Sequence, residues 1–418
     1  MVLKPMSVYY VNGMRLNKLD TVVLAYSGGV DTSVAIKLLK EEKYEVVTVT
    51  LDVGQKEDLK AIAKKAEKMG VLKHYSIDAK NEFVQNYVFP AIKANALYEG
   101  KYPVSTAISR PLIASKLVEV AKKENAKMVT HGCSGKGNDQ VRFDTTIKAL
   151  APNLKIIAPI RDWRWTRDKT IDYARKYGIQ IPVKKKPYSI DQNLWGRSVE
   201  CGPIEYPDQE PPEDAFEWTS SPEKAPNKPQ YVTIEFEHGV PIGLNGKSMD
   251  GVKLITTLSE LAGKHGVGRV DHIEDRLIGI KSREVYEVPA ATCILEAHKD
   301  LEKIVLTRHQ IMYKRNADEE WTFLAYSGLW VDPLREDLEA FINSTQERVT
   351  GEVKLKLFKG NAIVVGRSSP FSLYDLNLAR YDIKSTFDQA SSVGFIDIWS
   401  LPTRVARQLH AKKKKREA

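Results

Sequence analysis

The first 180 residues alternate between short apolar runs and stretches in which apolar positions follow helical spacing. The apolar, strand-type runs lie at residues 21–25, 46–51, 74–78, 127–131 and 155–158. The segments with helical spacing lie at residues 34–39, 56–69, 80–98 and 108–123. Strands that alternate with helices in this way predict an α/β fold: a doubly wound parallel sheet with ligands at the carboxyl ends of its strands.

The pattern changes in the second half of the chain, where the seven prolines of residues 203–229 indicate an extended arm. Strand-type alternation follows at residues 231–237, 353–358 and 362–366, and the last two predict a hairpin. Helical spacing returns at residues 254–263, 290–315 and 332–343. We expect a nucleotide-binding domain at 19–182, a mixed α+β domain at 183–393 that includes the arm, and a C-terminal helix with a basic tail at 394–418.

A strand, a glycine turn and a helix meet at residues 21–33, Thr-Val-Val-Leu-Ala-Tyr-Ser-Gly-Gly-Val-Asp-Thr-Ser. Such a turn directs free backbone N–H groups, hydroxyls and a positive helix end to one point, which suits a phosphate chain. We expect Asp31, Thr32 and Ser33 to cap the helix. The spelling matches neither the dinucleotide fingerprint nor the P-loop. It resembles the S-G-G-x-D-[ST] loop of ATP pyrophosphatases, and Asp31 among phosphates indicates a Mg²⁺ partner.

A second informative stretch, His-Gly-Cys-Ser-Gly-Lys-Gly-Asn-Asp-Gln-Val-Arg-Phe, covers residues 131–143 and begins at the end of a predicted strand. Its three glycines let the backbone approach a ligand, and its polar side chains carry both signs of charge. The stretch alone is equally typical of a flexible polar loop. Residues 25–33, 51–55 and 131–139 all follow strands of the predicted sheet, so we expect them to converge on one crevice.

A polar cluster at residues 269–276 and 279–286 has strand-type alternation. A strand there directs Asp271, Ile273 and Asp275 to one face and His272, Glu274 and Arg276 to the other. An exposed strand with paired charges explains the pattern as well as a binding face does. A partial copy of the glycine loop at residues 324–329 lacks the second glycine and the aspartate, so we attribute it to chance.

Charge and cysteine content narrow the class of protein. The formal net charge is +9, and residues 412–416 contribute five positive charges to it. No aromatic residues interleave with these five, so we expect a solvated tail and no nucleic-acid partner. The cysteines Cys133, Cys201 and Cys293 are too widely spaced for a C-x-x-C motif. No apolar stretch has the length of a membrane span or a signal peptide, so we expect a cytoplasmic protein without a membrane partner, in which residues 1–18 are a loose extension.

Several motifs occur in the order found in argininosuccinate synthases. These motifs are SGGVDTS, Asp52-Val-Gly-Gln55, Tyr102 with Thr106 and Arg110-Pro111, the 131–143 stretch, Ser189–Leu194 and the 274–283 stretch. The chain resembles this family from about residue 20 to residue 400. The resemblance implies an adenine nucleotide alpha hydrolase-like fold, ATP as a substrate with Mg²⁺, citrulline and aspartate as the other substrates, and a homotetramer. Two positions depart from the family pattern: Ser134 replaces a frequent threonine, and Ala107 replaces an occasional serine.

The resemblance also implies a role for individual residues. The residues implied to bind ATP are Ala25, Tyr26, Ser27, Gly28, Gly29, Val30, Asp31, Thr32, Ser33, Leu51 and Gly132. The residues implied to bind citrulline are Tyr102, Thr106, Asn138, Arg142, Ser189, Ser198, Glu274 and Tyr286. The residues implied to bind aspartate are Ser134, Asn138 and Asp139. No metal ligand is implied beyond the Mg²⁺ carried with ATP.

Two other classes of protein share the nucleotide loop. An ATP pyrophosphatase that adenylates a tRNA base fits the basic charge, but paired cysteines and a known RNA-binding module are missing from the sequence. A nucleotide-binding regulator similar to universal stress proteins has a similar sheet but does not need the polar second domain. The synthase is expected to release AMP and pyrophosphate only when both amino acids are present.

Overall fold

The computed structural model describes residues 20–180 and 187–417, which fall into two compact units that divide after Phe371. The expected extension at residues 1–18 and the boundary expected at 182–183 lie outside the described residues.

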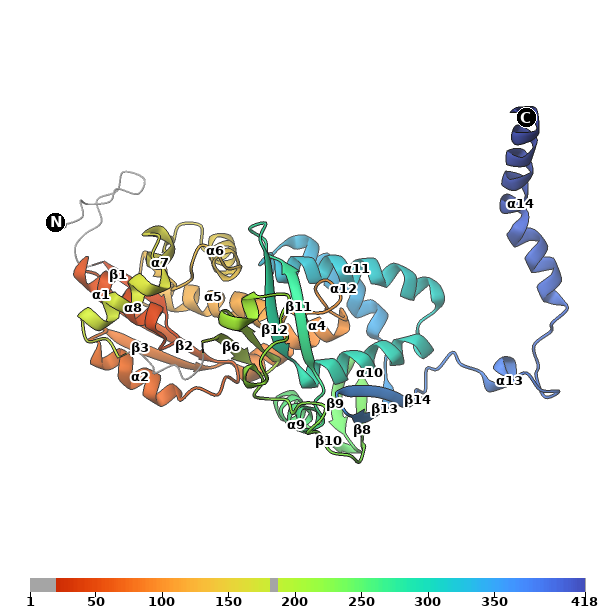
Figure 1. Ribbon diagram of the computed structural model, residues 1–418, viewed down its shortest axis with the longest axis horizontal. Coiled ribbons are helices and arrows are strands. Elements are labelled where there is room, and N and C mark those ends of the chain that lie inside the picture. Colours follow the sequence, from red (N-terminus) through yellow and green to blue (C-terminus); the bar gives the residue numbers. More distant parts are fainter. Residues whose placement is uncertain (1–19, 181–186, 418) are drawn as a thin grey trace. The chain divides into compact units, whose positions relative to one another are not determined.

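The first part of the larger unit is an α/β domain whose sheet is parallel, as the sequence predicts (Figure 1). The strand order is β3-β2-β1-β4-β5. The strands are β1 (Thr21–Ala25), β2 (Glu45–Asp52), β3 (Lys73–Asp78), β4 (Met128–Thr130) and β5 (Lys155–Ile157). Each lies within one residue of its predicted bounds at either end. The β-branched runs of β1 and β2 mark buried strands clearly, whereas β3 is only partly buried.

Helices cover both faces of this sheet. The helices of this part of the chain are α1 (Val30–Glu41), α2 (Leu59–Lys68), α3 (Lys80–Phe83), α4 (Phe89–Lys93), α5 (Ser105–Lys123), α6 (Asp139–Leu150), α7 (Pro159–Asp162) and α8 (Arg167–Lys176). Val22 and Leu24 of β1 pack in one apolar cluster with α1 and α2, whereas Val23 belongs to the cluster that contains α5. Alternate residues of one strand therefore face opposite layers, which confirms the doubly wound arrangement.

Three predicted helix details are wrong. The α1 helix begins at Val30 after the extended residue Gly29, so Asp31, Thr32 and Ser33 lie in its first turn and do not cap it. The helix predicted at 80–98 contains a π-helical segment at Val84–Val88 and ends at Lys93. The helix predicted at 290–315 is two helices, because Thr307 forms a capping box with Gln310 and starts a new one.

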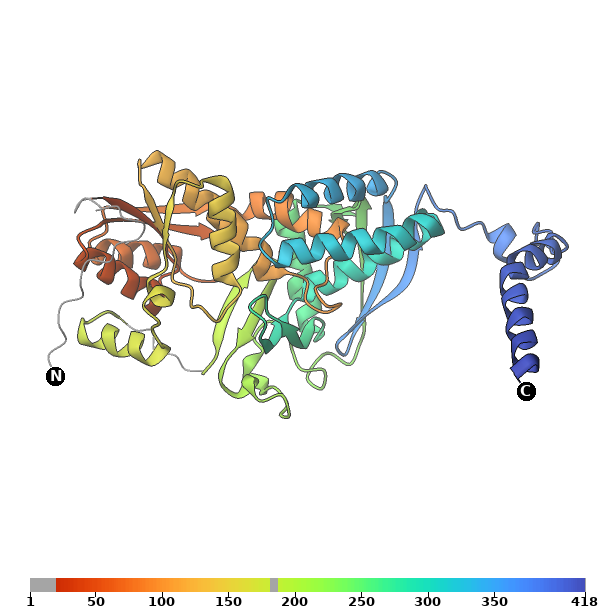
Figure 2. The same cartoon turned by 90° about the horizontal axis from the view of Figure 1, so that it is seen from above.

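The second part of the larger unit contains two antiparallel sheets. One has the order β11-β12-β7-β6 and the other the order β10-β9-β8-β13-β14. The strands are β6 (Ser189–Asn193), β7 (Gly196–Glu200), β8 (Gln230–Glu237), β9 (Val240–Leu244), β10 (Lys247–Ser248), β11 (Arg269–Asp275), β12 (Lys281–Glu287), β13 (Gly351–Phe358) and β14 (Asn361–Ser368). The helices are α9 (Gly251–Lys264), α10 (Pro289–Val305), α11 (Arg308–Tyr326) and α12 (Pro333–Gln346). In Figure 2 the helices α10 to α12 run beside one another, next to β13 and β14.

The proline-rich arm is anchored by one buried carboxylate. Apart from short 3-10 turns at Gly202–Glu205 and Glu213–Ala215, residues 203–229 are irregular. Glu287 of β12 accepts hydrogen bonds from the backbone N–H groups of residues 217, 218 and 219, and its Oε2 lies 2.6 Å from Nη1 of Arg197. Both Glu287 and Arg197 are fully buried, so this ion pair has no competing solvent.

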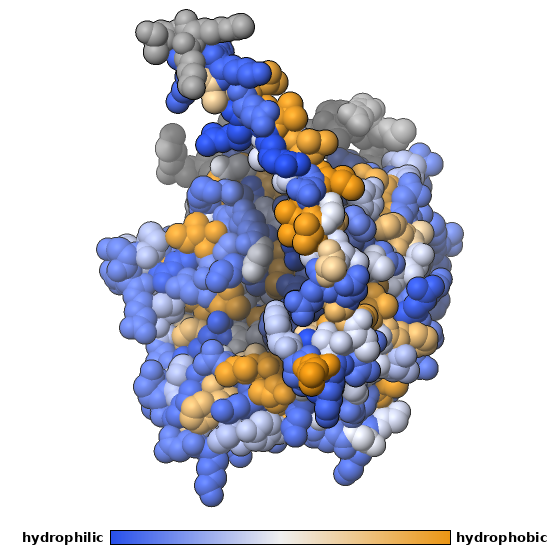
Figure 3. Space-filling view, turned by 90° about the vertical axis from the view of Figure 1, so that its right-hand side faces the viewer, coloured by the Kyte–Doolittle hydropathy of each residue, from blue (hydrophilic) through white to orange (hydrophobic). Residues whose placement is uncertain are grey.

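The smaller unit, from Ser372, contains α13 (Leu376–Ala379) and α14 (Ser391–Glu417). Phe395, Ile398 and Trp399 of α14 are each at least 60% exposed, and Figure 3 shows apolar side chains gathered along this helix. Within residues 20–180 and 187–417, no helix has the length and apolar character needed to cross a membrane.

Candidate active site

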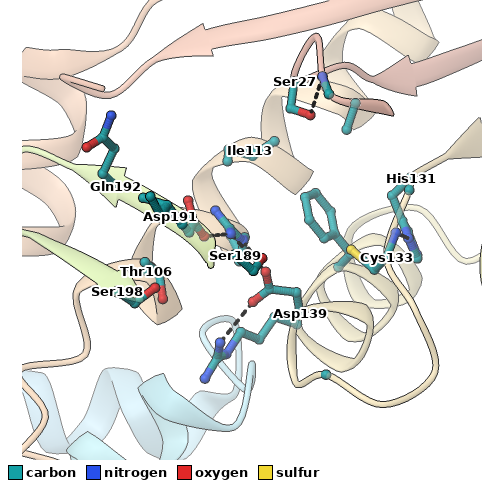
Figure 4. Close-up of a pocket in the computed structure, with 18 of the residues that line it drawn as sticks. Ser27, Thr106, Ile113, His131, Cys133, Asp139, Ser189, Asp191, Gln192 and Ser198 are labelled. Atoms are coloured by element: carbon teal, nitrogen blue, oxygen red, sulfur yellow. Dashed lines mark hydrogen bonds and ion pairs between the residues drawn. The ribbon is translucent and has the colours of Figure 1, made fainter. Parts of the chain in front are cut away.

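A cavity of about 480 Å³ lies where the carboxyl ends of β1, β2 and β4 meet the sheet formed by β6, β7, β11 and β12. The predicted convergence of residues 25–33, 51–55 and 131–139 is therefore confirmed. The predicted site residues that line the cavity are Ala25, Tyr26, Ser27, Gly29, Asp31, Thr32, Leu51, Tyr102, Thr106, Gly132, Ser134, Asn138, Asp139, Arg142, Ser189, Ser198, Glu274 and Tyr286. In the view of Figure 4, Ser27 lies on one side of the cavity and Thr106 with Ser198 on the other.

The remaining predicted residues, Gly28, Val30 and Ser33, do not line the cavity but shape the loop. Gly28 has a φ of +74°, a conformation that favours glycine. Val30 packs against a small apolar cluster that includes Val34 and Leu38 of α1. The hydroxyls of Ser33 and Tyr26 lie 3.2 Å apart and are buried, so this contact holds the first turn of α1 against the end of β1.

Polar contacts fix the glycine loop from within and from α2. The hydroxyls of Ser27 and Thr32 lie 3.2 Å apart, and the backbone N–H of Gly29 donates to Ser27 Oγ at 3.3 Å. Lys65 of α2 donates its ammonium to the carbonyl of Gly28 at 2.7 Å, and burial lowers the pKa of this lysine. The loop therefore combines hydroxyls, the first turn of a helix and a lysine in one place.

The loop after β4 packs directly on the glycine loop. A Cβ atom on Gly132 would lie 2.8 Å from the methyl group of Thr32, so glycine allows this close approach. His131, the residue before Gly132, is buried, and its Nε2 lies 2.8 Å from Oδ1 of Asp144 on α6. Ser134 is exposed on the same loop. Gly132 therefore brings this stretch against a nucleotide-type loop, which favours a recognition loop over a flexible one.

Two arginines hold Asp139 at the start of α6. Arg110 Nε donates to Asp139 Oδ2 at 2.8 Å, and Arg142 Nη1 donates to Asp139 Oδ1 at 3.0 Å. Burial acts to raise the pKa of Asp139, but the two guanidinium groups outweigh it and lower the pKa. Arg110 also pairs with Asp191 of β6, which is labelled in Figure 4. The carboxylate of Asp139 therefore stays ionised and in a fixed orientation.

The opposite wall of the cavity is one face of the antiparallel sheet. Residues two apart share a face, so Ser198 and Glu200 of β7 lie beside Tyr286 and Glu284 of β12. Glu274 of β11 belongs to the same face and is 2% exposed. The predicted alternation of this strand is confirmed, because Asp271, Ile273 and Asp275 are exposed whereas His272 and Glu274 are buried. The charge pairs are also present: Asp271 pairs with Arg283 on the outer face.

Stacked tyrosines close this wall. The ring of Tyr102 stacks on Tyr286 with centroids 4.3 Å apart, and its hydroxyl accepts the backbone N–H groups of Thr106 and Ala107. Tyr326 donates its hydroxyl to Glu274 Oε1 at 2.8 Å and accepts the amide of Asn138 at 2.7 Å. The stretch that contains Tyr326 ends helix α11 and is not a second nucleotide loop, so its likeness to the first is coincidental.

Sequence reasoning missed several contributors to the site. Glu200 and Glu284 line the cavity, while Lys65 and Tyr326 contact predicted site residues. Arg276, which the predicted alternation places on the face of Glu274, also lines the cavity although no role was assigned to it. The alternation that identified Glu274 also places Glu284 on the cavity face, given the pairing of β11 with β12. No local signal identifies Lys65 or Tyr326, because both reach the site only through the packing of helices. Among the described residues, no group of three or more His, Cys, Asp and Glu side chains is arranged to hold a metal ion.

This arrangement defines a nucleotide-binding protein of the HUP class, in which a glycine loop between β1 and α1 faces a polar second domain. The model of the arginosuccinate synthase N-terminal HUP domain matches residues 21–180, and that of the C-terminal domain matches residues 188–406. The chain belongs to the argininosuccinate synthase family, whose members are ligases that use ATP as a substrate.

Similarity to individual relatives extends over most of the chain. The argininosuccinate synthase of Pyrococcus furiosus is 58% identical over 386 residues, which are 92% of this chain and 94% of the relative. That of Bacillus pumilus is 54% identical over 385 residues, 92% of this chain and 96% of the relative. That of Listeria monocytogenes serotype 4a is 54% identical over 394 residues, 94% of this chain and 98% of the relative. Family membership therefore favours the synthase over a tRNA-modifying enzyme or a regulator.

Proposed function

We propose that this chain condenses citrulline with aspartate at the expense of ATP, giving argininosuccinate, AMP and pyrophosphate. The observation that carries the proposal is one continuous cavity that joins the glycine loop of the first domain to the charged sheet face of the second. One end suits a phosphate chain, and the other offers carboxylates, hydroxyls and a guanidinium for amino acids. Membership of the family supplies the names of the substrates.

ATP occupies the glycine-loop end of the cavity in this proposal. Residues 25–33 lie around the triphosphate, with the backbone N–H groups and hydroxyls of the loop directed at the β and γ phosphates. Leu51 and Gly132 contact the nucleoside from β2 and from the loop after β4. Asp31 would hold the Mg²⁺ that accompanies the triphosphate, since carboxylate and hydroxyl oxygens are the donors that this ion prefers. When bound, Mg²⁺ neutralises charge that develops on the phosphates.

Citrulline and aspartate occupy the other end. Tyr102, Thr106, Asn138, Arg142, Ser189, Ser198, Glu274 and Tyr286 are assigned to citrulline. Ser134, Asn138 and Asp139 are assigned to aspartate. Glu274 suits the α-ammonium group of citrulline because its buried carboxylate is directed by two tyrosine hydroxyls. Arg142 suits a carboxylate, and Asp139 suits the amine of aspartate.

The residue types fit a reaction that needs positioning rather than a protein nucleophile. The ureido oxygen of citrulline attacks the α phosphorus of ATP, and the bond from that phosphorus to the bridging oxygen breaks, so that pyrophosphate leaves. The amine of aspartate then attacks the activated carbon, loses a proton and displaces AMP. Alignment of bound reactants contributes on the order of 7–11 kcal/mol to such steps. The fixed orientations of Asp139, Arg142 and Glu274 serve this alignment.

Phosphorus NMR with magnesium and ATP tests the reaction. AMP and pyrophosphate are expected only when citrulline and aspartate are both present, because the loss of AMP in the second step drives turnover. Omission of either amino acid is the control. Formation of ADP and phosphate, or AMP without amino acids, would contradict the proposal.

The Glu274→Gln variant tests the citrulline end. Replacement of the carboxylate removes a charge-assisted hydrogen bond, which is worth about 1.5–3 kcal/mol, so KM for citrulline should rise by about 10- to 100-fold. KM for ATP should stay unchanged, since the glycine loop lies at the other end of the cavity. Steady-state kinetics with each substrate varied in turn measures both. An unchanged KM for citrulline at full activity would exclude this role.

We further propose a cytoplasmic homotetramer. The division into a nucleotide-binding domain at 19–182, a synthetase and multimerisation domain at 183–393 and an oligomerisation helix with a basic tail at 394–418 belongs to this proposal. The exposed apolar side chains of α14 support it, because such a helix gains stability by packing on another surface. Light scattering of the full chain and of a chain truncated after residue 393 tests it. A full chain that is monomeric at micromolar concentration would contradict it.

A further inference from the structure

Three carboxylates face one another on the sheet that lines the cavity. Glu200 lies on β7, Glu284 on β12 and Glu274 on β11, and all three border the cavity. Tyr286 pairs with Ser198 across β12 and β7, so Glu284 and Glu200, two residues further along each strand, also lie opposite each other. Like charges opposed on neighbouring strands destabilise a sheet. A cation between them removes this cost.

The guanidinium group of Arg276 supplies part of the positive charge that these carboxylates need. Nη2 of Arg276 lies 2.6 Å from Glu200 Oε2 and 3.4 Å from Glu284 Oε1. Its Nη1 donates to the carbonyl of Lys136 at 3.1 Å, which directs the guanidinium toward the loop after β4. The hydroxyl of Tyr286 donates to Glu274 Oε2 at 2.6 Å and lies 3.0 Å from Glu284 Oε2, but it brings no charge. The cluster therefore keeps an excess of negative charge.

Burial and this excess of negative charge raise the pKa values of two of the carboxylates. Burial, together with the negative charges of Glu274 and Glu200, raises the pKa of Glu284 to about 8. Burial also raises the pKa of Glu200, although Arg276 opposes it. The groups that face Glu284 are Glu200 of β7, His272 and Glu274 of β11, Arg276 after β11 and Tyr286 of β12. His272 is engaged elsewhere, with its Nε2 3.0 Å from Oε2 of Glu99.

We propose that Glu200 and Glu284 are specificity-determining residues that, with Glu274, require the citrulline-side substrate to carry a free α-ammonium group. This inference rests on the proposed function, because the three carboxylates lie at the end of the cavity that the proposed function assigns to citrulline. An ammonium group supplies the missing positive charge between the opposed carboxylates. An amino acid acylated on its α-nitrogen supplies none, so it gains no ion pair with these buried carboxylates and is rejected.

Substrate discrimination in the Glu284→Gln and Glu200→Gln variants tests the proposal. Each variant should raise KM for citrulline by about tenfold, with kcat and the KM values for ATP and aspartate within about twofold of wild type. The ratio of kcat/KM for citrulline to that for Nα-acetylcitrulline should fall by at least about tenfold. Asp271→Asn, on the outer face of β11 and paired with Arg283, is the matched control and should change neither quantity.

Proton release provides a measurement that needs no variant. At pH 7 most Glu284 side chains carry a proton in the empty site, and a bound ammonium group favours the ionised form, so binding of citrulline should release close to one proton. The release should be much smaller at pH 8.5, where the site is already largely ionised. Titration calorimetry in buffers of different ionisation enthalpy, with α,β-methylene-ATP bound, measures the number of protons released.

The pH dependence of turnover should show the same ionisation. The value of kcat/KM for citrulline should rise between pH 7 and 8.5 in the wild type and stay flatter in Glu284→Gln.

The outcomes separate this inference from the proposed function. A wild-type chain that makes AMP from ATP with both amino acids, but shows no proton release and keeps its discrimination in both variants, overturns the inference alone. A wild-type chain that neither binds nor consumes citrulline overturns the proposed function and the inference together. If one glutamine variant fails to fold, the discrimination of the other variant and the wild-type proton release decide together.

Discussion

The Asp31→Ala variant is expected to lose activity by at least about 10²-fold in kcat, the scale on which removal of one electrostatic contact to a transition state acts. Asp31 lies in the first turn of α1 and lines the cavity beside Ser27 and Thr32. Its loss removes the carboxylate that we propose for Mg²⁺ and weakens the stabilisation of departing pyrophosphate. Pyrophosphate release at saturating citrulline and aspartate measures the effect.

Two controls identify the cause. Asp31→Asn keeps the size of the side chain and removes its charge, so it should lose nearly as much activity as the alanine variant and regain part of it at higher Mg²⁺ concentration. Asp58→Asn changes a carboxylate that caps α2 and should leave kcat unchanged. A kcat of Asp31→Ala equal to that of the wild type at millimolar Mg²⁺ would show that this carboxylate does not hold the metal ion at the phosphates.

The Glu287→Gln variant is expected to have the largest effect on stability, a loss of about 3–5 kcal/mol in the free energy of unfolding. The change leaves the buried guanidinium of Arg197 without its anion, and it turns an amide N–H toward the backbone N–H groups of residues 217–219. Urea denaturation measures the loss. Limited proteolysis should show new cleavage within residues 206–229, because the arm loses its anchor.

Glu217→Gln is the matched control for this prediction. Glu217 contacts the same guanidinium at 3.2 Å, but its side chain is 59% exposed. An exposed pair contributes at most about 1 kcal/mol, so this variant should unfold close to the wild type and keep the arm protected from proteases. Equal effects of the two substitutions would mean that burial of Glu287 does not determine the strength of the anchor.

The sequence predicted the parts of the fold that depend on local patterns. Residues 21–25 and 46–51 became strands within a residue of their expected bounds because buried β-branched runs have one interpretation. The alternation of residues 271–275 correctly assigned Glu274 to a buried face. Local patterns failed where two signals compete, as at Thr307, where a capping box interrupts a continuous helical spacing.

The rest of the site was not predictable because tertiary packing brings it together. Glu284 joins the cavity only through the register of β12 with β7 and β11. Lys65 reaches the glycine loop because α2 packs beside α1, and nothing in its neighbours along the chain marks it. The family resemblance supplied positions such as Ser189 and Ser198, which their own sequence context does not distinguish from other strand serines.

The hydrogen bond between Asn138 and Tyr326 restricts how the two domains can evolve. The amide of Asn138 donates to the hydroxyl of Tyr326, and its Oδ1 accepts the backbone N–H of Leu277. A chimaera that joins residues 20–180 of this chain to a distant C-terminal domain without a tyrosine at this position leaves a buried amide unsatisfied. Exchange of one domain for a distant counterpart therefore requires a compensating change in the other.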